Sequence, residues 1–194
     1  MIRYIVLDTE TGGLLPNCSL LTLYLAVLND KLELEKELDL ALIPDDGVYK
    51  VEPAGMAVNK IDLVELGNRA ITYSQAKAKL AEFISTVYGE NPRFDAYPNE
   101  LKLIPIGHGT KGDLDIVQAN LMTKANWEKF CSYRFICTSN SLQFLRFQGK
   151  VPRELSGSLT SLAEYFKLEW EGESHTAKAD ALMTAKVLKE LAKL

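Results

Sequence analysis

The sequence predicts an α/β fold in which one mixed β-sheet is flanked by helices. Three apolar or alternating segments follow one another near the N-terminus, as the strands of a meander do. The later part of the chain alternates helical and strand-like segments, which places helices on the faces of the sheet. No repeat, low-complexity tract or Pro/Ser-rich linker interrupts the 194 residues, so we expect a single domain spanning residues 1–194.

Side-chain patterning predicts the first three strands. Residues 2–7 are rich in β-branched and aromatic side chains and carry no charge after Arg3, and residues 20–28 form a second apolar segment. Residues 32–42 alternate polar and apolar side chains, which is typical of a strand with one exposed face. Asp30 and Lys31 are expected to form a tight hairpin, which makes the second and third strands antiparallel.

The chain beyond residue 50 is expected to form mainly helices, with two more strands. Thr72 and Gln75 form a capping box ahead of a helix that ends at Gly89. Residues 51–63 are interpreted as a loop with at most a short helical turn. The remaining expectations are strands over 101–106 and 132–139, a turn and helix within 107–122, a helix over 139–148, a short helix capped by Ser161 and Glu164 and ending at Phe166, and a last helix over about 176–191.

Composition limits the class of protein. The hydrophobic content of 47% and charged content of 25% are those of a soluble globular chain. No apolar stretch approaches the roughly 20 residues that a membrane span requires, and no signal-peptide pattern is present. Three cysteines without paired spacing favour reduced thiols, so we expect a cytoplasmic location. The net charge of −4 argues against a broad basic surface but allows an acidic nuclease site with a local basic rim.

The predicted first strand ends in two acids, Asp8 and Glu10. Residues two apart in a strand point the same way, so the two carboxylates lie side by side. Like charges at that separation repel each other, and burying them is costly unless a positive charge lies between them. The pair therefore needs a cation.

Two later acids lie beside apolar helix faces. On a helical wheel, Asp180 falls near Leu191 at the edge of the apolar arc, and Asp113 flanks Leu114 while Asp115 points to solvent. Taken singly, each acid is explained by the positive end of its own helix. Four acids gathered at the carboxyl ends of strands would instead hold magnesium or manganese ions, which clamp the attacking and leaving oxygens in phosphoryl transfer.

Two histidines lie near these acids. His175 precedes Asp180 by five residues, which is not a same-face helical spacing, so we place it in the loop before the last helix. An imidazole there can act as a general base near neutral pH. His108 precedes Gly109 at a strand end and is interpreted as a structural histidine, with a supporting place behind the site as the alternative.

Together these stretches resemble the motifs of the DEDDh 3′–5′ exonucleases, a family that includes the proofreading subunit of bacterial DNA polymerase III, oligoribonuclease and RNase T. LDTETGGL resembles the first motif, GHGTKGDLDIV the second and HTAKAD the third, and the connecting segments are similar over nearly the whole chain. The chain departs from the family at Gly12, where a threonine is usual, and at Gly109 and Gly112, where an asparagine and an aromatic residue are usual.

The resemblance implies a ribonuclease H-like fold with a five-stranded sheet. It also implies a metal-dependent 3′–5′ exonuclease that releases nucleoside 5′-monophosphates from the 3′ end of single-stranded DNA, with RNA as a close variant. Two divalent ions, Mg²⁺ or Mn²⁺, would be held by Asp8, Glu10, Asp113 and Asp180, with His175 as the general base that completes the catalytic set. A DNA polymerase or another replication or repair protein is an expected partner, with proofreading or repair as the role.

The resemblance further suggests substrate contacts. Thr11 and Leu14 match positions that line the pocket for the terminal nucleotide, and Lys178 is a candidate phosphate contact because it lies between His175 and Asp180. One alternative is a catalytically weak module that binds nucleic acid or a polymerase, although all five catalytic positions are filled. Another is a phosphotransferase or ATPase, but the chain lacks a Walker-type glycine loop.

Overall fold

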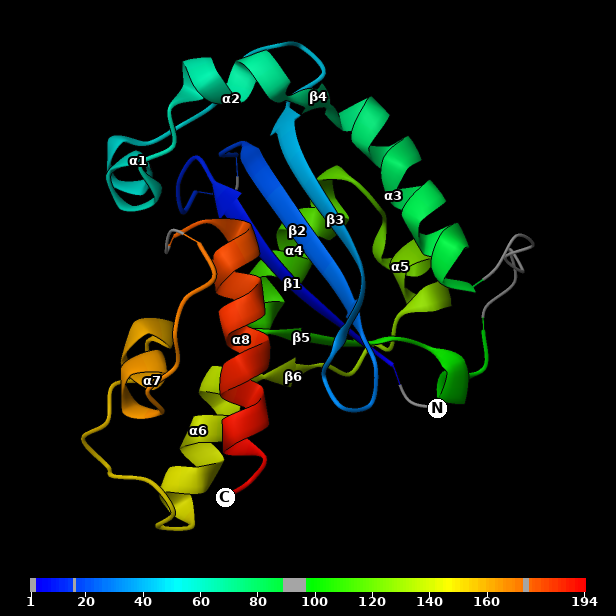
Figure 1. Ribbon diagram of the computed structural model, residues 1–194. Helices are drawn as coiled ribbons and strands as arrows, with labels where there is room; N and C mark the ends of the chain where they lie inside the picture. The colour runs from blue at the N-terminus through cyan, green and yellow to red at the C-terminus, as the bar shows by residue number, and fades with distance from the viewer. Residues whose placement is uncertain (1–2, 16, 89–96, 173–174) are drawn as a thin grey trace.

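The computed structural model describes residues 3–15, 17–88, 97–172 and 175–194 (Figure 1). Their strands form one mixed sheet in the order β4-β3-β2-β1-β5-β6. The strands are β1 (Tyr4–Thr11), β2 (Leu20–Leu28), β3 (Leu34–Ile43), β4 (Ile71–Thr72), β5 (Ile104–Gly107) and β6 (Ile136–Cys137). The helices are α1 (Pro53–Asn59), α2 (Leu63–Arg69), α3 (Tyr73–Tyr88), the 3₁₀ turn η1 (Asn99–Leu101), α4 (Thr110–Asn120), α5 (Lys124–Phe130), α6 (Thr138–Phe147), α7 (Leu159–Tyr165) and α8 (Ala177–Leu191).

The predicted α/β architecture is confirmed, with one more strand than expected. β1 is central, antiparallel to β2 and parallel to β5, and β2 and β3 are antiparallel as predicted. The prediction of five strands missed β4, which pairs with β3 over two residues and is too short to show an alternating pattern. The strand predicted over 132–139 was too long, because only Ile136–Cys137 pairs with β5 in a ladder.

Helices cover both faces of the sheet (Figure 1). On one face, Ile5 and Leu7 of β1 pack against a core built with α3, α4 and α5. On the other face, Val6 packs against Ala177 and Ala181 of α8. Because strand residues alternate, Asp8 and Glu10 continue the face of Val6 and lie on the side of α8, whereas Thr9 lies on the side of α4.

The segment predicted as a loop over 51–63 contains α1 and the start of α2, so that prediction was wrong. Both helices have seven residues, too few to show a helical repeat. Their ends nonetheless carry local signals: Pro53 occupies the first turn of α1, and the Asp62 carboxylate accepts hydrogen bonds from the backbone N–H groups of Val64 and Glu65. The equally short α5, capped by Thr123, was missed for the same reason.

Local capping was predicted correctly at one helix and wrongly at another. Thr72 and Gln75 exchange the two hydrogen bonds of a capping box, as expected, whereas the predicted end of that helix at Gly89 lies outside the described residues. In α7 the cap is Ser158, whose Oγ accepts from the N–H of Ser161, so Ser161 lies inside the helix.

The predicted two-residue hairpin at Asp30 and Lys31 is longer than expected. The Asn29 side chain accepts hydrogen bonds from the N–H groups of Lys31 and Glu33, and β3 begins only at Leu34. Within the part of the chain that the structure describes, no helix combines the length and the apolar character needed to cross a bilayer.

Candidate active site

Three carboxylates meet at the carboxyl end of β1. Asp8, Glu10 and Asp180 each contribute an oxygen that lies within 4.8 Å of the others, a spacing at which all three can bind one metal ion. Asp180 arrives there because it occupies the first turn of α8, whose small residues Ala177 and Ala181 pack closely on the sheet. Thr176 caps that turn by accepting a hydrogen bond from the N–H of Ala179.

Asp113 reaches the same strand end from the opposite face of the sheet. It lies in the first turn of α4, and its Oδ1 accepts a 2.7 Å hydrogen bond from the hydroxyl of Thr9. Its charge contributes to the raised pKa of Asp8, so the fourth predicted acid adjoins the other three. Asp115 is exposed and pairs with Lys111, as the helical wheel predicted.

Sequence reasoning missed the role of Thr9. The alternation of side chains along β1 contained the signal, because the residue between Asp8 and Glu10 must face α4, the helix that carries Asp113.

Burial raises the pKa of all four acids, and neighbouring acids raise the pKa of Asp8 and Glu10 further. Burial is the largest cause for Asp8, followed by the charges of Asp113, Glu10 and Asp180. Burial, Asp180 and Asp113 together raise the pKa of Glu10 to about 8, and burial raises that of Asp113 to about 6 although the Thr9 hydroxyl lowers it. Raised pKa values are expected for carboxylates that are shielded from water and lie close to other negative charges. Their oxygens are the ligands that hard divalent cations prefer, so the residues present fit such a metal.

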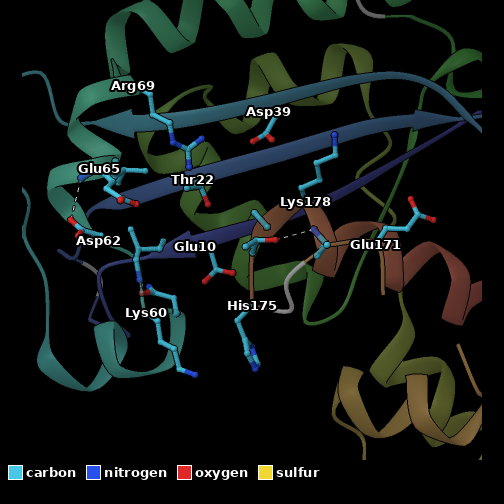
Figure 2. Close-up of a pocket in the computed structure, with 17 residues that line it drawn as sticks. Glu10, Thr22, Asp39, Lys60, Asp62, Glu65, Arg69, Glu171, His175 and Lys178 are labelled. Carbon is cyan, nitrogen blue, oxygen red and sulfur yellow. Dashed lines mark hydrogen bonds between the residues drawn. The ribbon is translucent and has the colours of Figure 1, made fainter. Parts of the chain in front are cut away.

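His175 stands beside this cluster in an uncommon backbone conformation. Its φ of 66° lies in the left-handed region, and its backbone N–H donates a 3.2 Å hydrogen bond to Oδ1 of Asp180. Figure 2 shows the exposed imidazole directed away from Glu10. The structure therefore brings His175 to the site by its backbone, with the ring outside the acid cluster.

A cavity of about 570 Å³ opens beside Glu10, between α2, Thr22 of β2, Asp39 of β3 and the start of α8 (Figure 2). Arg69 reaches into it from α2, and His175 and Lys178 line its other side. Thr11 and Leu14 are not among the described residues that line it.

Lys178 is held on the cavity wall by an acid of the sheet. Its ammonium lies 3.0 Å from the carboxylate of Glu37 and over the ring of Tyr24. The Tyr24 hydroxyl donates a 2.5 Å hydrogen bond to the same carboxylate. The candidate phosphate contact is thus already engaged within the protein.

Thr11 is the last residue of β1, and Leu14 lies in the turn that follows. The Thr11 hydroxyl donates to the carbonyl of Gly13, and the carbonyl of Thr11 accepts from the buried amide of Asn59. Leu14 is 98% exposed. A side chain at Gly12 would bring a Cβ within 2.5 Å of the Lys50 carbonyl oxygen, so the threonine usual in the family does not fit this backbone.

The second departure from the family has a different explanation. Gly109 has a φ of 88° immediately before α4, a conformation that glycine adopts without strain. A Cβ at Gly112 would meet open space. The neighbouring His108 shares a 2.7 Å hydrogen bond with Thr138, and burial lowers the pKa of His108, which supports its interpretation as a structural histidine.

The fold can be compared with solved structures. E. coli Exonuclease I bound to a dT13 oligonucleotide superposes with a TM-score of 0.74 at 17% identity, over 98% of this chain and 41% of that one. The nuclease domain of 3′hExo, a DEDDh family member bound to rAMP, superposes with a TM-score of 0.66 at 16% identity, over 98% of this chain and 92% of that one. The fold is that of the DEDDh exonucleases.

Further comparisons agree with this DEDDh-type, ribonuclease H-like fold. Cell-death related nuclease 4 (CRN-4) superposes with a TM-score of 0.70 at 15% identity, over 98% of this chain and 64% of that one. The chain spans less than half the length of Exonuclease I, of which a zinc-bound form with single-stranded DNA is also known. No protein-family model matches the chain, and no curated protein is significantly similar to it in sequence.

Proposed function

We propose that the protein is a metal-dependent 3′–5′ exonuclease, acting as one domain, that hydrolyses the terminal phosphodiester bond of single-stranded DNA or RNA and releases nucleoside 5′-monophosphates. The observation that carries this proposal is the group of Asp8, Glu10 and Asp180, whose oxygens lie within 4.8 Å of one another, with Asp113 adjoining it. Burial and the neighbouring Asp180 and Asp113 raise the pKa of Glu10 to about 8, which supports a site that takes up positive charge from a bound ion.

Asp8, Glu10, Asp113 and Asp180 would hold two divalent ions, Mg²⁺ or Mn²⁺. Bound there, the ions would supply positive charge to the attacking and leaving oxygens of the phosphodiester. The hydrogen bond from Thr9 orients the carboxylate of Asp113, and the cap at Thr176 fixes the turn that carries Asp180.

His175 is the proposed general base, which takes a proton from the attacking water. Its backbone hydrogen bond to Asp180 keeps it beside the acids, and the imidazole has to turn inward from its exposed position to act. Catalytic hydrogen bonds are often made only once substrate is bound.

The cavity beside Glu10 is the proposed place for part of the substrate strand, and the terminal nucleotide would reach beyond it to the end of β1 and the following turn. Thr11 and Leu14 would contact the terminal nucleotide, and Lys178 would contact a phosphate if it leaves Glu37. The solved structures with this fold hold a DNA oligonucleotide in Exonuclease I and rAMP in 3′hExo, so both sugars belong in the test. Association with a polymerase, proofreading, repair and a cytoplasmic location stay predictions from the sequence.

Digestion of 5′-labelled single-stranded DNA and RNA of identical sequence, under single-turnover conditions with Mg²⁺, Mn²⁺ or a chelator, tests the proposal. We expect a metal-dependent ladder that shortens from the 3′ end and is absent with Asp8→Ala. The ratio of the DNA and RNA rates identifies the preferred sugar. Binding of both strands without any ladder would contradict an exonuclease and favour a nucleic-acid-binding module.

A further inference from the structure

The turn that follows β1 holds a leucine out in solvent. Leu14 is 98% exposed, although it lies only four residues beyond Glu10 at the edge where the acids meet. An isolated exposed leucine needs no explanation, but this one lies in a turn whose backbone is held by a distant carboxylate. The arrangement points to a residue that fixes the turn for contact with something outside the fold.

That carboxylate belongs to Glu52. Its Oε2 accepts hydrogen bonds of 2.8 Å from the N–H of Leu14 and 3.3 Å from the N–H of Leu15. Glu52 is also the residue that caps α1, yet its side chain makes no hydrogen bond to its own helix. A capping side chain usually bonds the first turn of its helix, so here that capacity is directed to the turn instead.

The backbone of Glu52 joins the same turn. Its N–H donates a 2.6 Å hydrogen bond to the carbonyl of Gly12. A Cβ built on Gly13 would lie 2.2 Å from Oε2 of Glu52, and one on Gly55 would lie 2.6 Å from the Cα of Gly13. The absence of side chains at these glycines therefore allows the turn and the start of α1 to pack in direct contact.

The charge of Glu52 also acts on the interior of the turn. Burial raises the pKa of the Cys18 thiol, and the neighbouring Glu52 carboxylate raises it further. An ionised carboxylate is a stronger acceptor for two N–H groups than a neutral oxygen is. Glu52 thus anchors the turn through two side-chain hydrogen bonds and one backbone hydrogen bond.

We propose that Glu52 is a positioning residue that holds the turn of residues 12–15 so that Leu14 packs against a base at the end of a bound nucleic-acid strand. The proposal rests on the proposed exonuclease function and adds to it a residue that touches neither the substrate nor the acids. Without the carboxylate, the two N–H groups lose their acceptor and Leu14 is no longer fixed. Substrate binding then weakens while the chemical step, which depends on other residues, is unchanged.

A double-mutant cycle tests whether Glu52 acts through Leu14. The variants are Glu52→Ala, Leu14→Ala, both together, and Glu52→Gln, which keeps an oxygen acceptor. We expect Leu14→Ala to raise KM about tenfold, since contact with one base contributes on that scale, and Glu52→Ala to raise it by a similar factor. The double variant should resemble Leu14→Ala, and Glu52→Gln should restore most of the affinity, with kcat unchanged throughout.

Glu164→Ala removes an equal charge from an exposed site on α7 and serves as the matched control, and melting temperatures verify folding. The proposal is overturned if the two single effects multiply in the double variant, if kcat falls while KM is unchanged, or if Glu52→Gln is as impaired as Glu52→Ala. Should the wild-type protein cleave nothing, the exonuclease proposal fails. The same cycle measured as dissociation constants, by fluorescence anisotropy of a labelled single-stranded oligonucleotide, then decides the role of Glu52 separately.

Discussion

Two acids on the same face of the sheet have pKa values that are shifted in opposite directions. Glu37 of β3 accepts hydrogen bonds from the Tyr24 hydroxyl and the Lys178 ammonium, and these partners lower its pKa. Burial and the charges of Asp180 and Asp113 raise the pKa of Glu10 in β1 to about 8. Lys178 supplies a cation to Glu37, whereas the described charges that act on the pKa of Glu10 are those of other acids.

This difference implies that the acids at the end of β1 lower the stability of the fold that carries them. The pair of Glu37 and Lys178 is satisfied within the chain. The acids at the end of β1 cost free energy in the folded state until positive charge arrives from outside. A metal site is therefore expected at β1 and not at Glu37, and the following predictions test that contrast.

The largest expected effect is the loss of cleavage in Asp8→Ala. Asp8 is at the centre of the cluster, since the other three acids all act on its pKa. The measurement is the rate of metal-dependent shortening of a 5′-labelled oligonucleotide. Asp115→Ala, which removes an exposed acid paired with Lys111 on α4, is the matched control and should stay active. Activity of wild-type level in Asp8→Ala would refute the role of the cluster.

His175→Ala is expected to lower kcat by about 10²- to 10⁴-fold, the usual contribution of a general base, with little change in KM. Steady-state kinetics on single-stranded DNA at several pH values measure this. In the variant, kcat should also no longer rise with pH as a general base loses its proton. A rise in KM with kcat unchanged would instead make His175 a substrate contact.

The stability of the metal-free protein is expected to fall as pH rises. The folded-state pKa of Glu10 is raised from its ordinary value of 4.5 to about 8, so the folded state binds more protons than the unfolded state between those values. The stabilisation that comes from protonated Glu10 is fully present below its ordinary pKa and is lost as pH rises through about 8.

Melting temperatures in chelator across that range measure the effect. Asp8→Asn should flatten the curve because it removes one of the repelling charges, and Mg²⁺ should raise the melting temperature more at the high end than at the low end. A metal-free melting temperature that rises with pH, unaltered in Asp8→Asn, would contradict the repulsion inferred at β1.

The smallest effect is expected for Lys178→Met. Its ion pair with Glu37 is about half exposed, so unfolding free energy should change by less than about 1 kcal/mol. If Lys178 contacts a phosphate, the dependence of log Kd on log salt should become shallower by about one unit. An unchanged salt dependence would show that Lys178 serves Glu37 alone.

The sequence was sufficient for the features that depend on local pattern. The alternation in β1 placed Asp8 and Glu10 on one face, and the helical wheel separated the inward Asp113 from the exposed Asp115. Long strands and helices repeat their pattern several times, so they were recognised. The seven-residue helices α1 and α2 and the two-residue strand β4 complete too few repeats to be distinguished from loops, and the equally short α7 was predicted from a capping signal and not from a repeat.

Only the tertiary structure decided which side chains meet. The contacts of Thr9 with Asp113, of Lys178 with Glu37 and of Glu52 with Leu14 join residues that lie 104, 141 and 38 positions apart. No local periodicity encodes such a pair, because each contact depends on how α4, α8 and α1 pack on the sheet. The sequence by itself therefore determined which acids face inward. Packing determined that the described acids at the end of β1 act on one another, whereas Glu37 of β3 is paired with Lys178.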